Sequence, residues 1–127
     1  MVSRAWDWFH QAERDLEMAA AAREWERHEW ACFAAQQAAE KAVKALHLRH
    51  GQEAWGHMVA GLLGELPVAA PGELVEKGRV LDNFYVGTRY PDGHPAGAPF
   101  EHYGTIQSGD ATAYAGEIVE FVRSQMA

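Results

Sequence analysis

The chain has 127 residues and a mass of 14.1 kDa, which is enough for one domain with a buried core. Hydrophobic residues make up 48% and charged residues 23%, a balance that argues against intrinsic disorder. The formal net charge of −7 excludes a protein that coats RNA or an anionic membrane over its whole surface. It leaves room for a small cationic site. We therefore expect a single domain over residues 1–127.

The single cysteine, Cys32, excludes an intrachain disulfide framework and a Cys-rich zinc site. It lies among alanines, so we expect a packed side chain rather than a nucleophile. No apolar run approaches the roughly 20 residues that a membrane span requires, and the first residues lack the apolar segment of a signal peptide. These features favour a cytoplasmic protein without a membrane partner.

The first element is a helix from Ser3 to about Arg23, with Ser3 as the N-cap. Its expected apolar face repeats at steps of three and four residues, as Ala5, Trp8, Ala12, Leu16 and Ala19. Trp6 and Phe9 widen this face. The charged stretch over residues 23–29 is the expected turn.

A second helix is predicted from Glu29 to His50, with Gly51 as its C-terminal stop. It carries alanines at positions 31, 34, 35, 38, 39, 42 and 45. Small side chains at this density let a neighbouring helix approach closely. That neighbour is either another helix of the bundle or a second copy of the chain docked on a flat alanine face.

The second half predicts two shorter helices, a loop and a last helix. A helix over residues 58–66 ends at Pro67, and another runs from Pro71 to about Tyr85. Three prolines and three glycines make residues 88–107 a loop of unusual length for so small a domain. Ser108 to Asp110 cap the last helix. We predict an all-α, up-and-down bundle of four to five helices.

Familiar motifs for phosphate, dinucleotide and zinc chemistry are missing from the sequence, which has no G-x-x-x-x-G-K-[ST], G-x-G-x-x-G or H-E-x-x-H. His47 and His50, three residues apart with His57 nearby, could bind a metal. We favour the alternative that the first two complement the negative end of a helix dipole. No metal or other cofactor is predicted.

Lys41 and Lys44 form a short basic edge on the second helix, followed by His47 at the same spacing. This edge could contact phosphates. The alternative is a solvated helix face without a ligand, and we favour that interpretation.

Arg89 and His94 stand five positions apart at the entrance to the long loop. Three Arg–His pairs with four to six intervening residues occur in the chain, and the other two begin at Arg4 and Arg23. The Arg89 pair differs in its context, the segment YVGTRYPDG. Together with the first-helix segment AERDL and the second-helix segment FAAQQAAEKAVKALHLRHG, it resembles the HEPN family over most of the chain.

The resemblance implies a HEPN-like helical bundle that dimerises. Many members are metal-independent ribonucleases that use an arginine, four to six intervening residues and a histidine. On this pattern Arg89 would stabilise negative charge at phosphorus, and His94 would carry a proton during attack by a ribose 2′-hydroxyl. Tyr90 could stack on a base, and Lys41 and Lys44 could extend the phosphate track.

Two interpretations of the loop stay open. Active members commonly have a small polar residue after the arginine, whereas Tyr90 and Pro91 follow it here. In the alternative interpretation, Arg89 pairs with an acidic group, and His94 and His102 are exposed loop residues without a function.

The leading functional hypothesis is a domain that binds RNA or a nucleotide phosphate as a homodimer. The resemblance adds a possible minimal nucleotidyltransferase partner in a two-component, toxin–antitoxin-like system. The competing hypothesis is a metal-independent ribonuclease that uses Arg89 and His94.

Overall fold

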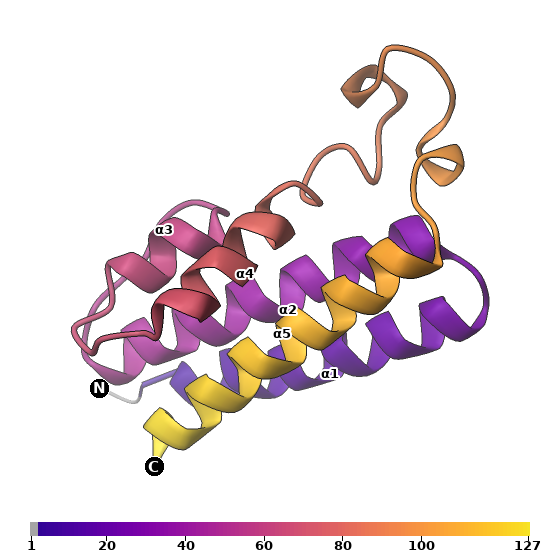
Figure 1. Cartoon of the computed structure of the whole chain (residues 1–127). Helices are drawn as coiled ribbons and strands as arrows, with labels where there is room; N and C mark the ends of the chain where they lie inside the picture. Colours follow the sequence, from indigo (N-terminus) through magenta and orange to yellow (C-terminus); the bar gives the residue numbers. More distant parts are fainter. Residues whose placement is uncertain (1–2) are drawn as a thin grey trace.

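The computed structural model describes residues 3–127, and in this range it contains five α-helices, two short 3₁₀ turns and no strand (Figure 1). The helices are α1 (Ala5–Glu24), α2 (His28–Arg49), α3 (Val59–Gly64), α4 (Gly72–Asp82) and α5 (Thr105–Met126). The predicted all-α bundle is therefore confirmed. The first two residues of the predicted domain lie outside the described range.

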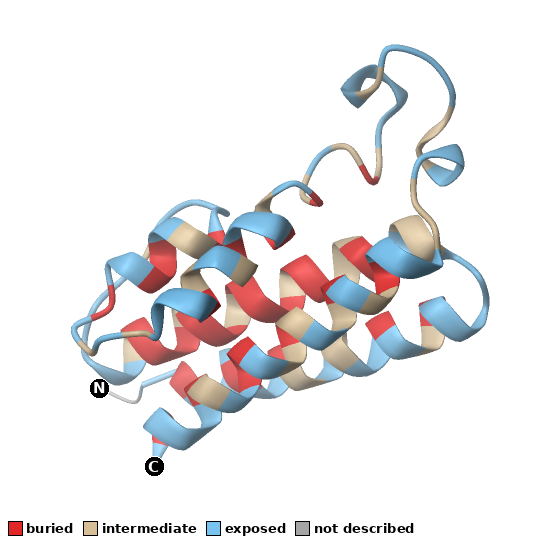
Figure 2. Cartoon of the chain, in the orientation of Figure 1, coloured by how far each residue is buried: buried red, intermediate tan, exposed pale blue. Residues whose placement is uncertain are grey.

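Helix α2 is the centre of the bundle: it packs against α1 and α5 and also contacts α3 and α4 (Figure 1). Its fully buried alanines lie inside this one chain, where Figure 2 shows a nearly continuous buried face. They are Ala31, Ala35, Ala38, Ala39, Ala42 and Ala45. The alternative of an alanine docking face for a second copy is thus wrong. The small side chains let α1 and α5 approach α2 closely.

The aromatic residues expected on the apolar face of α1 are not equally buried. Phe9 is buried, with 2% of its surface exposed, whereas Trp8 is 37% exposed. The two neighbours point about 100° apart on a helix, so only one of them can face α2 and α5. Trp8 instead lies at the edge of the bundle, where the Lys44 ammonium approaches its ring at 5.9 Å. The smaller Phe9 ring fills the core position.

Two helix boundaries differ from the predicted ones because side chains satisfy free backbone groups earlier than expected. Helix α5 begins at Thr105, where the Gly104 N–H donates to Gln107 Oε1 at 2.7 Å. Ser108 is therefore a buried residue inside the helix rather than its cap. Helix α4 ends at Asp82, where Asn83 Nδ2 donates to the Arg79 carbonyl at 3.2 Å, so Tyr85 already belongs to the following loop.

Asp82 joins α4 to α3. Its carboxylate accepts the Val59 N–H at 2.5 Å and the Ala60 N–H at 3.4 Å, so it satisfies two free donors at the start of α3. Burial raises the pKa of this carboxyl above its ordinary value, although the two backbone donors oppose the shift. The short α3–α4 hairpin is thus tied together by a partly buried polar contact.

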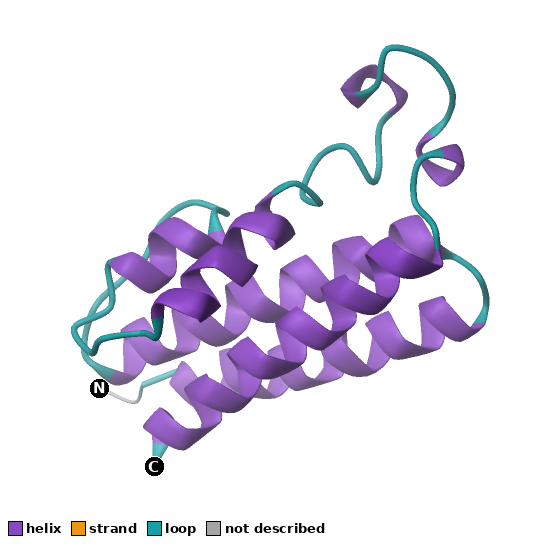
Figure 3. Ribbon diagram, viewed as in Figure 1, coloured by secondary structure: helices purple, strands orange, loops and turns teal. Residues whose placement is uncertain are grey.

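The connection between α4 and α5 is the long loop, residues 83–104, which projects from the bundle with its two 3₁₀ turns, Pro91–Gly93 and Pro99–Glu101 (Figure 3). At its base Thr88 is buried, and its Oγ1 donates to the Phe84 carbonyl at 2.7 Å. The Phe84 ring meets Tyr103 edge-on at 5.9 Å between centroids. Both ends of the loop are therefore anchored on the core.

Across residues 3–127, every helix is too short or too polar to traverse a lipid bilayer.

Candidate functional site

Arg89 is fixed by the main chain of its own loop. Its Nε and Nη2 atoms donate to the Tyr85 carbonyl at 2.9 and 2.6 Å. Among residues 3–127 it forms no ion pair, so the alternative in which it pairs with an acidic group is wrong. Since a guanidinium carries five N–H donors, others remain for a ligand. The positive charge of Arg89 is thus oriented but not neutralised.

Three aromatic rings surround this guanidinium. Its central carbon lies 4.3 Å from the centroid of Phe33, 4.9 Å from that of Tyr85 and 5.1 Å from that of Tyr90. These distances are within the range in which a cation is attracted to a ring face. Phe33 comes from α2, so the cage joins the loop to the central helix. Tyr90 is half exposed and stands on the solvent side.

His94 is held in a single tautomer by a backbone contact. Its Nε2 lies 2.7 Å from the Gly87 carbonyl oxygen, and because a carbonyl only accepts, Nε2 must carry the proton. In the neutral imidazole, Nδ1 is then the basic nitrogen. Gly87 permits the contact: a Cβ there would lie 2.7 Å from the Tyr103 hydroxyl and 3.5 Å from His94 Nε2. The close approach of Tyr103 and His94 to the main chain therefore depends on a glycine at position 87.

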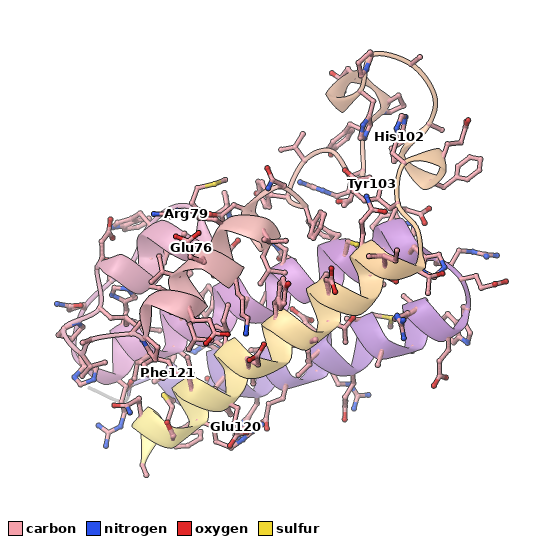
Figure 4. All side chains as sticks on the ribbon, viewed as in Figure 1. Glu76, Arg79, His102, Tyr103, Glu120 and Phe121 are labelled. Carbon is pink, nitrogen blue, oxygen red and sulfur yellow. The ribbon has the colours of Figure 1, made fainter. Side chains whose placement is uncertain are left out.

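A second histidine, His102, lies against the first. The two imidazoles stack at 4.0 Å between centroids with 3° between their planes, and Tyr103 meets His94 edge-on at 5.7 Å. His102 Nε2 donates to the Ala96 carbonyl at 2.6 Å. Figure 4 shows His102 and Tyr103 where the chain returns toward α5. His102 is thus part of the His94 environment.

Lys41 and Lys44 have carboxylate partners. Lys41 Nζ lies 2.5 Å from Asp15 on α1, and Lys44 Nζ lies 3.1 Å from the buried Glu40. Both side chains are largely buried, at 25% and 13% exposed. Neither has a contact with the cage of Arg89, whose α2 member is Phe33. The structure thus joins Arg89, Tyr90 and Phe33 but leaves the lysines in separate ion pairs.

The other candidates from the sequence have structural partners. His47 is buried, with Nε2 donating to the Leu62 carbonyl at 2.9 Å, and His57 contacts Glu40. No group of three or more metal-binding side chains occurs within residues 3–127. Cys32 is buried, and burial raises the pKa of its thiol to about 12. It therefore stays protonated and is a poor nucleophile.

Together, the two loop residues present complementary chemistry. Arg89 and His94 each donate to a backbone carbonyl, those of Tyr85 and Gly87, which are two residues apart in the chain. One supplies a permanent positive charge with free donors, and the other supplies a basic nitrogen. The sequence did not indicate that Phe33 and Tyr103 belong to this site or that His102 stacks on His94. No local pattern marks a contact between distant parts of a chain.

A HEPN domain profile matches residues 5–125 of the chain. Among solved structures, the chain is similar to TT1696 from Thermus thermophilus, with 47% identity, a TM-score of 0.95 and coverage of 98% of this chain and 99% of that one. It is 38% identical to ST0689, an archaeal HEPN homologue, with a TM-score of 0.86 and coverage of 99% and 100%. A HEPN domain protein of Thermotoga maritima, TM0613, is also 38% identical, with a TM-score of 0.75 and coverage of 93% and 95%. No curated protein matches.

Proposed function

Because this chain belongs to the HEPN domain family, we propose that it binds RNA or a nucleotide phosphate at Arg89 and His94, as a single domain. The observation that carries the proposal is that the charge of Arg89 is oriented but not neutralised. Its guanidinium is aimed by the Tyr85 carbonyl, has no carboxylate partner among the described residues and keeps free donors. Such a group pairs well with the oxygens of a phosphate.

The acidic composition of the chain is compatible with a local site of this kind. The net charge is −7, yet the stretch over residues 86–100 carries Arg89 and His94 against Asp92 alone. Tyr90, half exposed beside the guanidinium, offers a ring for a base next to the bound phosphate. Lys41 and Lys44 contribute less in this proposal, since binding a phosphate there would compete with Asp15 and Glu40.

The proposal includes self-association in the cytoplasm and a minimal nucleotidyltransferase as partner in a toxin–antitoxin-like pair. Family membership supports both partners. For the homodimer there is further support in a groove between α1 and α2, lined by Met18, Trp25 and Trp30, each more than half exposed. Exposed apolar side chains that gather in one place are typical of a protein interface. Sedimentation velocity measures the oligomeric state directly.

A second candidate function, metal-independent RNA cleavage, is favoured by one specific observation. The bond from Nε2 of His94 to the Gly87 carbonyl leaves Nδ1 as the basic nitrogen. A histidine with a fixed tautomer can accept the proton of a ribose 2′-hydroxyl as that oxygen attacks the adjacent phosphorus. Arg89 would then stabilise the extra negative charge on the phosphoryl oxygens. The P–O5′ bond then breaks, which leaves a 2′,3′-cyclic phosphate, and the departing 5′-oxygen takes a proton from water.

The test is equilibrium binding of a fluorescein-labelled single-stranded RNA, followed by anisotropy in chelator at several salt concentrations. Arg89→Ala should lower the affinity roughly tenfold or more and should reduce the salt slope by about one. Arg79→Ala is the matched control, because Arg79 is an exposed arginine on α4 whose partner is Glu76 (Figure 4). Equal affinities of these two variants would contradict the proposal.

The same samples test cleavage. If the ribonuclease function holds, RNA is cut in chelator by the wild type and Arg79→Ala, and cutting is lost in His94→Ala and Arg89→Ala. If the wild type binds RNA but does not cut it, the binding function stands and the ribonuclease function fails.

A further inference from the structure

We infer that Glu40 and His57 are positioning residues for Arg89 and that they act through Tyr85. The inference rests on the proposed function only in taking Arg89 as the phosphate anchor. Neither residue contacts the proposed ligand site directly. Three contacts connect them to it: a buried carboxylate holds an imidazole, the imidazole stacks on a phenol ring, and the carbonyl of that tyrosine aims the guanidinium.

The first contact is made by the buried carboxylate of Glu40 in the middle of α2. Only 5% of this residue is exposed, and a carboxylate so deeply buried requires several donors. It accepts from Gln36 Nε2 at 3.1 Å, from Lys44 Nζ at 3.1 Å and from His57 Nδ1 at 3.1 and 3.2 Å. Of these donors, only His57 comes from outside the helix.

His57 is held at two points. Besides the bond from its ring to Glu40, its backbone carbonyl accepts from Gln36 Nε2 at 3.0 Å. Gln36 is itself fully buried, and its Oε1 accepts from Gln37 Nε2 at 2.8 Å. The segment between α2 and α3 therefore has a fixed place on α2 at His57. Because both the main chain and the ring are held, the ring has a defined plane.

The second contact is the stack of that ring on Tyr85. The centroids lie 4.3 Å apart, and the planes differ by 16°. Tyr85 follows the end of α4 at Asp82, so no helical hydrogen bond fixes its orientation. Its ring is placed instead by His57 and by Phe33, whose centroid is 6.3 Å away.

The third contact is the pair of hydrogen bonds from Arg89 to the Tyr85 carbonyl. The guanidinium also faces the Tyr85 ring at 4.9 Å, so ring and carbonyl both determine its direction. Phe33 contacts both partners, since its ring lies 4.3 Å from the guanidinium carbon. If the Tyr85 ring loses the support of His57, only Phe33 still holds it, and the carbonyl that receives Arg89 is less firmly oriented.

This role is separable from the stability of the bundle. The His57 side chain is 49% exposed and lies outside the buried apolar core. Loss of its ring therefore removes little apolar burial. Within residues 3–127, its hydrogen bonds and ring stack are those with Glu40, Gln36 and Tyr85. Without the imidazole, the Glu40 carboxylate keeps Gln36 and Lys44 as donors, so a change at His57 should affect Arg89 more than the folding of the chain.

The test is NMR of the Arg89 Nε–H group in the ligand-free protein, with its signal assigned by its absence in Arg89→Lys. In His57→Ala, exchange of this proton with water should become roughly tenfold faster. His57→Phe keeps a ring against Tyr85 without the bond to Glu40 and should restore most of the protection. Glu40→Gln should give a smaller acceleration, and His50→Ala, an exposed histidine at the end of α2, should give none.

RNA affinity of the same variants separates the two proposals. If exchange accelerates in His57→Ala but the wild type binds no RNA, the positioning role holds and the proposed function fails. Unchanged exchange in a folded His57→Ala overturns the positioning role, whatever the RNA result. If His57→Ala does not fold, the result for His57→Phe decides. Exchange of the Arg89 Nε–H proton in that variant at the rate of an unprotected guanidinium would contradict support of Tyr85 by the ring.

Discussion

The bundle and the long loop are held together by different forces. In the bundle, buried apolar residues of α1, α2 and α5 form one core, and Figure 2 shows such buried positions along these helices. In the loop over residues 83–104, the repeated device is a polar side chain that donates to a nearby carbonyl. Thr88, Arg89, His94 and His102 donate to the carbonyls of Phe84, Tyr85, Gly87 and Ala96.

The difference explains where chemistry can reside. A buried leucine or alanine stabilises the fold by leaving water and has nothing to offer a ligand. A side chain that donates one or two hydrogen bonds to a carbonyl is oriented and still has a free donor or a free lone pair. In this chain, Arg89 and His94 both help to shape the loop and present groups to solvent. Changes in the two regions should therefore separate stability from binding.

The largest effect on stability is expected from Leu46→Ala. Leu46 is fully buried on α2, and truncation leaves a cavity in the centre of the bundle. We expect a loss of about 2–5 kcal/mol in the free energy of unfolding, measured by chemical denaturation. Leu48→Ala, at a half-buried position on the same helix, is the control and should cost less. Equal losses would mean that burial on α2 does not decide stability. At temperatures where the variant remains folded, RNA affinity should be unchanged.

Gly87→Ala should change stability less than Leu46→Ala does, but it should disturb His94 and RNA binding more. The added Cβ would lie 2.7 Å from the Tyr103 hydroxyl, so Tyr103 and the nearby His94 must shift. The free energy of unfolding should change by less than about 1 kcal/mol, while the His94 ring signals move in NMR spectra and RNA affinity falls.

Gly116→Ala on α5 provides the contrast, because no atom lies within 4 Å of its Cβ position. It should stabilise the helix by about 0.5–1 kcal/mol without moving the His94 signals. If Gly87→Ala left those signals in place, the loop would not depend on the close approach at Gly87.

The smallest effect is a pH dependence from Asp82 in the α3–α4 hairpin. Burial raises the pKa of its carboxyl above the ordinary 3.8, with Glu40 adding to the shift. A carboxyl whose pKa is higher in the folded than in the unfolded chain stabilises the fold below its unfolded pKa, and this contribution is lost as the pH rises through the folded pKa. The wild type should therefore gain stability relative to Asp82→Asn as the pH falls from neutrality toward 3.8.

Denaturation of both proteins across this pH range measures the difference. Asp92→Asn, at an exposed loop position, is the matched control. A relative gain for Asp82→Asn at low pH would contradict the assigned direction.

Much of the bundle was predictable because helix signals are local. The alanines of α2, the prolines after α3 and before α4, and the Pro- and Gly-rich loop each act over a few residues. Trp8 shows the limit: its spacing fits the apolar face as well as that of Phe9, but only one of two adjacent positions faces the core. Arg89 and His94 were recognised through their context in the chain, whereas their catalytic and binding roles stay predictions.

The sequence by itself determined the all-α class, the approximate helices and the loop that carries Arg89 and His94. Only the tertiary structure decided what surrounds these residues. Phe33, His57 and Tyr85 lie 24 or more positions apart from one another in the sequence, yet the rings of Phe33 and His57 both lie against that of Tyr85 beside Arg89. Periodicity and capping reflect forces between near neighbours along the chain. The orientation of a guanidinium depends on which helices pack together, and that is settled by the fold as a whole.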